Sequence, residues 1–223
     1  ASAVYIFNDI CDLEADREHE KKKIRPLASG SITKLKSIFV LITFLLCSAV
    51  LCLRFEISFN SILILLAYCA VNLFYSIGLK HVCILELFLV ASGFILRLFF
   101  GATIIGVSLS PWILVCTGLL SLMIVTGKRR GDLVQNNDPN YRRRSLAGYN
   151  LQFLDGLNIA LSAATFTAYL IFCTSKYGIE KFGSELIITS IFVLYGMVHY
   201  LRIIMVDNSG DDPTSLILTN RTI

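Results

Sequence analysis

Charged residues are scarce in this chain. Asp, Glu, Lys and Arg make up 16% of its 223 residues, whereas about a quarter of an ordinary soluble domain is charged. Hydrophobic residues account for 55% of the sequence, and the mean hydropathy is +0.69. These values exclude a soluble globular domain and indicate a chain embedded in a lipid bilayer, with no nucleic-acid partner.

Long apolar runs make up most of the sequence. A helix needs ~20 apolar residues to cross a hydrocarbon core of ~30 Å, and several segments meet this requirement. They are residues 35–53, 59–77, 84–105, 110–127, 151–173 and 184–206. We therefore predict an all-α fold, a multi-pass transmembrane helical bundle that forms a single domain over residues 1–223.

An initiator methionine is absent, and the first seven residues are mostly apolar. We interpret residues 1–7 as the last turns of a further span, and the last residues as a polar tail that ends abruptly. The bundle is therefore expected to be incomplete at both termini, and the 1–223 segment alone is expected to be inactive. We also expect no secretory signal peptide in residues 1–223, because the opening has neither a basic region nor a small-residue cleavage site.

Cysteine motifs are missing as well. The seven cysteines are scattered and lie mostly inside apolar runs, without a CxxC pair or a Cys/His cluster. The sequence therefore indicates neither a disulfide framework nor a zinc site. We expect these cysteines to serve as small packing residues.

Basic residues are distributed unevenly between the loops. One side of the membrane receives residues 8–34, 78–83, 128–150 and 207–223, which hold most of the lysines and arginines. The positive-inside rule places this side in the cytoplasm, at the inner (cytoplasmic) membrane of the cell. Polar residues gathered on one face favour chemistry on a cytoplasmic substrate at the bilayer surface. The non-enzymatic alternatives are a channel or transporter, which needs access from both faces, and a lipid-binding scaffold.

An acidic cluster follows the first apolar segment. Asp9, Asp12 and Asp16 are spaced at i, i+3 and i+7, so a helix would present all three carboxylates on one face. Stacked like charges repel one another and require a cation. A divalent ion shared with the phosphates of a substrate would supply it. The alternative is a solvated acidic helix end.

A second polar segment follows the fourth span. It runs from Gly127-Lys128-Arg129-Arg130-Gly131-Asp132 through Asp138 to Tyr141-Arg142-Arg143-Arg144-Ser145. Both polar segments mix acids with bases, as a magnesium–diphosphate site requires. We expect them to be cytoplasmic loops of two half-bundles that face each other over a cavity.

Polar residues inside the spans are costly and therefore indicate functional sites. They form three helical stripes: Glu86, Gly93 and Arg97; Tyr68, Asn72 and Tyr75; and Tyr195, His199 and Arg202. For Arg97 the alternative is a structural ion pair or a contact with backbone carbonyls. For the tyrosines the alternative is anchoring at the membrane interface.

These motifs resemble those of the UbiA-type intramembrane prenyltransferases over nearly the whole chain. The matching pieces are Asn8-Asp9-x-x-Asp12-x-x-x-Asp16 with Lys22 and Arg25-Pro26, Tyr75-Ser76-x-x-Leu79-Lys80, Gly93-Phe94 with Arg97, and Gly101-Ala102. Members that act on aromatic or similar acceptors usually carry a second aspartate motif, DxxxD. Here Lys128 stands where the first aspartate of that motif is expected.

One branch of this family uses decaprenyl phosphate and phosphoribosyl pyrophosphate, and further motifs resemble it. They are Gly127-Lys128-Arg129, Arg144-Ser145-Leu146-x-x-Tyr149, Arg202, Pro213 and Arg221. Asp132 and Asn220 depart from the branch, which has Glu and Asp at these places. The resemblance implies transfer of 5-phosphoribose to a polyprenyl phosphate. The alternative is a prenyl-diphosphate transferase that alkylates an aromatic or isoprenoid acceptor, but Asp132 and Asp138 have the wrong spacing for its second acidic pair.

The resemblance also implies roles for individual residues. Mg²⁺ would be held by Asn8, Asp9, Asp12 and Asp16, and the three aspartates would be the catalytic residues. Lys22, Arg25 and Lys80 would contact the pyrophosphate, and Lys128, Arg129 and Arg144 the ribose 5-phosphate or the lipid phosphate. The other candidates for substrate binding are Asn8, Tyr75, Arg97, Asp132, Tyr149 and Arg202. The lipid phosphate would attack with inversion and without a general base, because it is already anionic.

Overall fold

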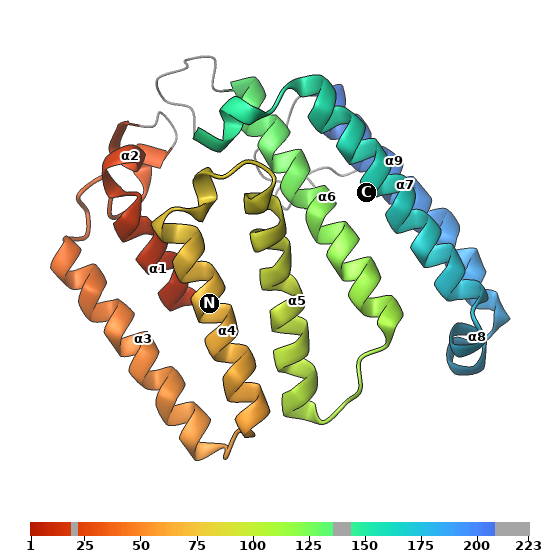
Figure 1. Ribbon diagram of the computed structural model, residues 1–223, viewed down its shortest axis with the longest axis horizontal. Helices are drawn as coiled ribbons and strands as arrows, with labels where there is room; N and C mark the ends of the chain where they lie inside the picture. Colours follow the sequence, from red (N-terminus) through yellow and green to blue (C-terminus); the bar gives the residue numbers. More distant parts are fainter. Residues whose placement is uncertain (19–21, 136–143, 208–223) are drawn as a thin grey trace.

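The computed structural model describes residues 1–18, 22–135 and 144–207, and every regular element in these ranges is a helix (Figure 1). Six segments are long and apolar enough to cross a membrane. They are α3 (Lys34–Arg54), α4 (Phe59–Ile77), α5 (Leu85–Ile105), the Pro111–Val134 part of α6 (Pro111–Gln135), α7 (Leu151–Thr174), and Ser184–Met205, which comprises η5 (Ser184–Ile188) and α9 (Thr189–Met205). The predicted all-α, multi-pass membrane fold is confirmed.

Shorter helices precede the first span or connect the spans. They are α1 (Ser2–Cys11), α2 (Leu13–Glu18), η1 (Lys22–Ile24), η2 (Leu79–His81), η4 (Arg144–Gly148) and α8 (Lys176–Phe182). Side-chain caps fix where several spans begin, because they satisfy backbone N–H groups that have no partner within the helix. Thr33 accepts from the N–H of Lys36 at the start of α3, and Asn150 accepts from the N–H of Phe153 at the start of α7.

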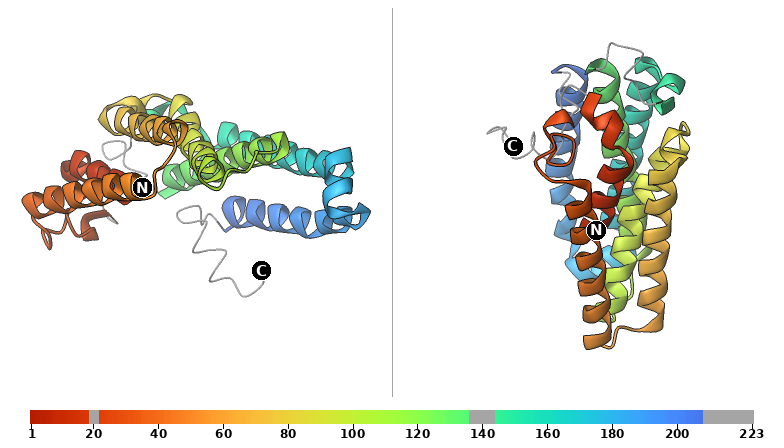
Figure 2. Two further views of the ribbon diagram at one scale, coloured as in Figure 1. Left: turned by 90° about the horizontal axis from the view of Figure 1, so that it is seen from below. Right: turned by 90° about the vertical axis from the view of Figure 1, so that its left-hand side faces the viewer.

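The long helices pack side by side in a curved row. Helix α1 lies between α3 and α4, and α4, α5, α6 and α7 then follow in chain order. Helix α9 packs against α7 and turns the row back on itself, as the view from below in Figure 2 shows. Most large apolar side chains of α3 and many of those of α4 and α5 are exposed, where the acyl chains of a bilayer would cover them.

The fourth span is longer than the sequence predicted. We expected it to end at residue 127 and Lys128–Asp132 to begin a loop, but α6 continues to Gln135. The prediction was wrong because it followed hydropathy, which falls at Lys128. The charged turns remain helical because Arg129 and Arg130 find acidic partners on α5 and α7.

The polar connections gather at one end of the row. Figure 1 shows α2, the α4–α5 connection, the end of α6 and η4 all at its upper edge. A small apolar core lies beneath them, formed by Leu87, Val125, Leu133, Leu146, Tyr149 and Leu154. The described parts of the two polar segments thus lie at one end of the molecule.

Candidate active site

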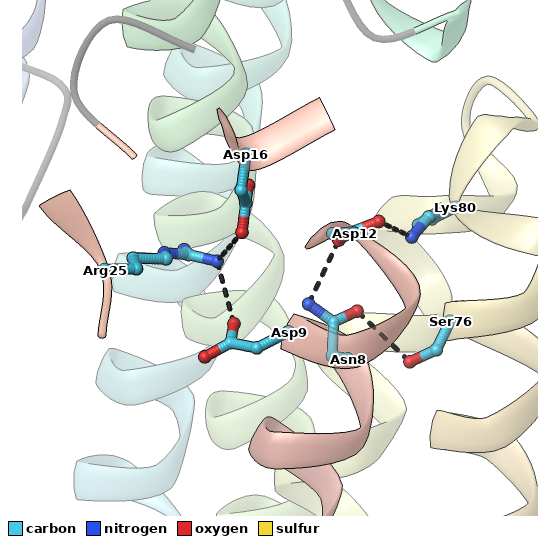
Figure 3. Close-up of polar contacts among 7 residues, drawn as sticks. All are labelled: Asn8, Asp9, Asp12, Asp16, Arg25, Ser76 and Lys80. Carbon is cyan, nitrogen blue, oxygen red and sulfur yellow. Dashed lines mark hydrogen bonds and ion pairs between the residues drawn. The ribbon is translucent and has the colours of Figure 1, made fainter. Parts of the chain in front are cut away.

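The first part of the site is the aspartate cluster, by which we mean Asn8, Asp9, Asp12 and Asp16. Helix α1 ends at Cys11, and Asp12 adopts φ −96° and ψ 4° before α2 begins. This irregularity divides the carboxylates, which a single straight helix would have stacked on one face. Asp9 and Asp16 turn toward Arg25, whereas Asp12 turns away from them (Figure 3).

Arg25 bridges two of the three carboxylates. Its Nη1 atom donates to Asp9 Oδ1 at 2.9 Å and to Asp16 Oδ2 at 2.8 Å. Asp16 is buried, whereas Asp9 and Arg25 are about a third exposed on their side chains. Two carboxylate oxygens therefore converge on one cationic nitrogen.

Asp12 is tied to the α4–α5 connection. Its Oδ1 atom forms a short ion pair with the Lys80 ammonium group, which is only 4% exposed. Asn8 Nδ2 donates to the other oxygen of Asp12 at 3.2 Å, and Ser76 Oγ donates to Asn8 Oδ1 at 3.1 Å. These contacts fasten the end of α1 to α4 and η2.

The carboxylates of the aspartate cluster repel one another. Among the described contacts, Arg25 pairs with Asp9 and Asp16, and Lys80 pairs with Asp12. Burial raises the pKa of Asp9 above its ordinary value; Arg25 opposes this rise, and the charges of Asp16 and Asp12 add to it. An incoming divalent cation would relieve this repulsion.

The donor chemistry fits Mg²⁺, although three protein ligands do not converge. Among the described residues, no group of three or more His, Cys, Asp or Glu side chains is close enough to hold a metal. Mg²⁺ usually takes only one or two protein carboxylates and completes its shell with water and substrate phosphates. Asp9 and Asp16, which meet at one nitrogen of Arg25, satisfy that requirement.

The second part of the site is the arginine cluster, which we define as Glu86, Lys128, Arg129 and Asp132. Arg129 Nε lies 3.2 Å from Glu86 Oε2, and Arg129 Nη1 forms a short ion pair with Asp132. Glu86 is fully buried and Arg129 is 5% exposed. Lys128 is exposed and lies in the last turns of α6. Arg129 thus joins α6 to the start of α5.

Residues 80–86 connect the two clusters. Lys80 reaches Asp12 in the aspartate cluster, and Glu86 reaches Arg129 in the arginine cluster. Only five residues separate Lys80 from Glu86, so the clusters are neighbours at the same end of the bundle. The described parts of the two polar segments therefore lie on either side of the α4–α5 connection, and a cavity between them stays a prediction.

Arg130 is a structural residue that sequence reasoning missed. Its Nε donates to Asp155 Oδ1 at 2.5 Å, and its Nη1 donates to the backbone oxygen of Ile204 at 2.6 Å. It therefore joins the ends of α6, α7 and α9 below the site. The adjacent Arg129 has the same residue type, and no spacing in the sequence distinguishes the two roles.

The other predicted residues lie in varied surroundings. Arg97 donates to Tyr68 Oη at 2.6 Å and lies over the rings of Tyr68 and Phe94. Tyr149 Oη accepts from the N–H of Ile84 at 2.7 Å. Tyr75 and Lys22 are half-buried, and Arg202 is exposed in the last turn of α9.

Several predicted positions lie outside what can be placed. Asp138, Tyr141, Arg142, Arg143, Pro213, Asn220 and Arg221 are outside the described residues. Arg144 is the first residue of η4, and η4 adjoins η2.

An all-helical membrane fold with an NDxxDxxxD motif at one end defines a class of intramembrane proteins. The chain belongs to the UbiA prenyltransferase family, whose sequence profile matches residues 1–220. A solved UbiA homologue from Archaeoglobus fulgidus, bound to DMAPP and Mg²⁺, has the same fold. It superposes with a TM-score of 0.71 at 17% identity, covering 91% of this chain and 70% of that one.

Within the family, the chain is similar to decaprenyl-phosphate phosphoribosyltransferases. The protein of that name from Mycolicibacterium smegmatis is 34% identical over 155 residues, which are 69% of this chain and 48% of the relative. The one from Corynebacterium glutamicum is 33% identical over 161 residues, covering 69% of this chain and 47% of the relative. The chain spans about half the length of these curated relatives.

Proposed function

We propose that the protein transfers 5-phosphoribose from phosphoribosyl pyrophosphate to a polyprenyl phosphate of the decaprenyl type, at the cytoplasmic face of the membrane. The observation that carries this proposal is that residues 80–86 join the aspartate cluster to the arginine cluster, which includes Lys128. The names of the curated relatives support the same substrates.

The reaction exchanges one bond at the anomeric carbon. The C1–O bond to pyrophosphate breaks and its electron pair leaves with the pyrophosphate oxygen. An oxygen of the lipid phosphate forms the new C1–O bond from the opposite face. No proton has to be removed from the nucleophile, because a phosphate monoester is already anionic at neutral pH. Among the described residues, neither cluster contains a histidine, which fits this reaction.

The aspartate cluster would bind the diphosphate end of the donor. Asp9 and Asp16, and Asp12 directly or through water, would hold Mg²⁺, with Asn8 Oδ1 as a further oxygen. When bound, Mg²⁺ neutralises charge on the departing pyrophosphate. Arg25 and Lys80 hold the carboxylates in the described arrangement, and with Lys22 we assign them to the oxygens of the pyrophosphate. The carboxylates would also stabilise positive charge that develops on the ribose.

The arginine cluster would bind the other phosphate. Lys128 is exposed at this end of α6 and provides a point charge for the ribose 5-phosphate or the lipid phosphate. Arg144 remains a candidate for the same phosphates. Arg129 is engaged by two carboxylates, so we assign it first to holding α6 against α5.

Transfer of a prenyl group is the second candidate, and residue 128 argues against it. Such an enzyme needs a second acidic pair for its metal ions, and here Lys128 precedes an Asp132 that is already paired with Arg129. Mg²⁺ with DMAPP in the Archaeoglobus fulgidus homologue supports the metal, which both candidates share.

The test uses protein expressed from its complete gene and reconstituted in liposomes. Radiolabelled phosphoribosyl pyrophosphate, decaprenyl phosphate and Mg²⁺ are added, and label in the organic phase is measured. We expect Mg²⁺-dependent transfer that Asp12→Asn abolishes and Glu180→Gln preserves. Glu180 is a matched control because it is exposed at the opposite end of the bundle, near Lys176.

Two outcomes would overturn the proposal. Label that enters the organic phase only with a prenyl diphosphate and an aromatic acceptor would identify a prenyltransferase. Absence of transfer in both assays, with lipid binding retained, would identify a non-enzymatic lipid-binding protein. Mass spectrometry of the lipid product separates the first outcome from the expected polyprenyl phosphoribose 5-phosphate.

A further inference from the structure

The connection between the two clusters contains a strained turn. Ile84 adopts φ 66° and ψ −51°, and the N–H of Leu85 donates to the backbone oxygen of Cys83 at 2.7 Å. This combination is a γ-turn of the rare type with positive φ. A β-branched residue strongly disfavours positive φ, so the surroundings of Ile84 must hold the turn in place.

The hydroxyl of Tyr149 is placed to hold it. Tyr149 Oη accepts a 2.7 Å hydrogen bond from the N–H of Ile84. Tyr149 is 7% exposed, and its ring stacks on Phe153. Burial also raises the pKa of Tyr149, so its hydroxyl stays neutral at physiological pH. The phenol is therefore a fixed polar group against the turn.

The segment around Tyr149 lies directly on the turn. A Cβ atom added at Gly148 would come within 2.8 Å of Cys83 Sγ. This close approach explains a glycine next to Tyr149, because a side chain there would push η4 away from Cys83. The Ile84 side chain itself is half exposed, so its own packing contributes little to the turn.

The turn sets the direction of both neighbouring charged residues. Lys80 lies four residues before Ile84 and pairs with Asp12, whereas Glu86 lies two residues after it and pairs with Arg129. A change of backbone direction at Ile84 would move Glu86 relative to Lys80. The geometry of the turn therefore determines how the two clusters are oriented toward each other.

We propose that Tyr149 is a positioning residue, whose hydroxyl holds the Cys83–Leu85 turn and thereby sets Lys80 against Asp12 and Glu86 against Arg129. This inference rests on the proposed phosphoribosyl transfer for its kinetic consequence. It gives the tyrosine of the Arg144-Ser145-Leu146-x-x-Tyr149 motif a role without substrate contact.

The experiment compares Tyr149→Phe, Ile84→Gly and the double variant in liposomes. Tyr149→Phe removes only the hydroxyl, and we expect kcat/KM for phosphoribosyl pyrophosphate to fall about tenfold. Glycine adopts positive φ without strain, so Ile84→Gly alone should stay within about twofold of the unmodified protein. In the double variant, Ile84→Gly should restore most of the lost activity. The shape of the pH profile should not change in any variant, because Tyr149 moves no proton.

A second readout does not depend on activity. Hydrogen exchange followed by mass spectrometry should show faster exchange of the Ile84 amide in Tyr149→Phe. Tyr169→Phe is the matched control, because its hydroxyl also has a partner, Thr189 Oγ1 at 2.7 Å, but far from the turn. That variant should change neither kcat/KM nor exchange at Ile84.

Three results decide the matter. Unchanged exchange at Ile84 in Tyr149→Phe would overturn the inference. Loss of activity that Ile84→Gly does not restore would also overturn it, since Tyr149 would then act on substrate directly. An unmodified protein without transfer activity would refute the proposed function, while the exchange measurement would still test whether Tyr149 holds the turn.

Discussion

The buried ion pair between Glu86 and Arg129 leads to a quantitative prediction about stability. Glu86 is fully buried, and its Oε2 atom lies 3.2 Å from Arg129 Nε. Replacing Arg129 with methionine would leave the Glu86 carboxylate without this cation. Removal of one partner of a buried ion pair costs roughly 3–5 kcal/mol, because the remaining buried charge loses its counter-ion.

The reverse replacement should cost less. In Glu86→Gln, Arg129 keeps its second partner, Asp132, which is about a quarter exposed. The expected loss is about 1–3 kcal/mol, which is the usual cost of leaving a buried polar group imperfectly paired. In the double variant Glu86→Gln/Arg129→Met, no charge is left buried alone. Its loss should therefore fall short of the sum of the single losses by roughly 0.5–3 kcal/mol.

Unfolding by SDS in mixed micelles measures these free energies. Arg54→Met is a suitable control and should have almost no effect. Arg54 is an exposed arginine at the last residue of α3, at the end of the bundle opposite to the two clusters. Equal losses in the two single variants, or strict additivity in the double variant, would contradict the assignment of Arg129 as the residue that anchors α6 to α5.

Three further predictions concern the packing of α6, the metal and the product. Gly127→Ala should destabilise the fold by about 1–3 kcal/mol, because its Cβ would lie 2.6 Å from Ile204 Cδ1 and closer still to Tyr200 Oη. Gly118→Ala, whose Cβ would have no neighbour nearer than 3.4 Å, should be nearly neutral in the same SDS unfolding assay. Burial raises the pKa of Asp9. As the pH is lowered, the Mn²⁺ affinity measured by EPR should therefore begin to fall at a higher pH than it would with an aspartate of ordinary pKa. Asp9→Asn should remove that part of the pH dependence, and an unaltered pH dependence would exclude Asp9 as a ligand. The contribution of Asp9 to the free energy of unfolding has the opposite pH dependence to that of a salt-bridged aspartate. It is present below the ordinary pKa of aspartate and is lost as the pH rises through the raised pKa. The lipid product should have the anomeric configuration opposite to that of phosphoribosyl pyrophosphate, which NMR of the ribose C1 proton would establish; retention would require a covalent intermediate.

The sequence was sufficient to predict the spans, because their length is determined by the thickness of the bilayer. Segments 35–53 and 59–77 were placed to within a residue or so of α3 and α4. The motif Asn8 to Asp16 located the acidic residues that follow the first apolar segment, but the prediction that one helix would present all three carboxylates on one face was wrong. Helix α1 ends at Cys11, so Asp12 pairs with Lys80 whereas Asp9 and Asp16 pair with Arg25.

Long-range partners could not be predicted in this way. Lys80 pairs with Asp12 across 68 residues, and Arg130 binds an oxygen of Ile204 across 74. Helical periodicity relates only residues a few positions apart and does not reach across such separations in the sequence. No pattern in the sequence therefore distinguished Arg130 from Arg129. For the same reason the extension of α6 to Gln135 was missed, because the acids that stabilise its charged turns lie on α5 and α7.

The charges of the two clusters bear on the choice between the candidate reactions. The aspartate cluster, with Arg25 and Lys80 included, carries three negative and two positive groups. The arginine cluster carries two of each, since Lys128 and Arg129 balance Glu86 and Asp132. An aspartate at 128 would give the second cluster an excess of negative charge, which suits a second metal ion but repels a phosphate. Lysine at this position keeps it balanced, and the exposed side chain of Lys128 can bind a phosphate. In the proposed reaction both substrates carry a phosphate besides the leaving group, so residue 128 favours ribosyl transfer over prenyl transfer through electrostatics alone.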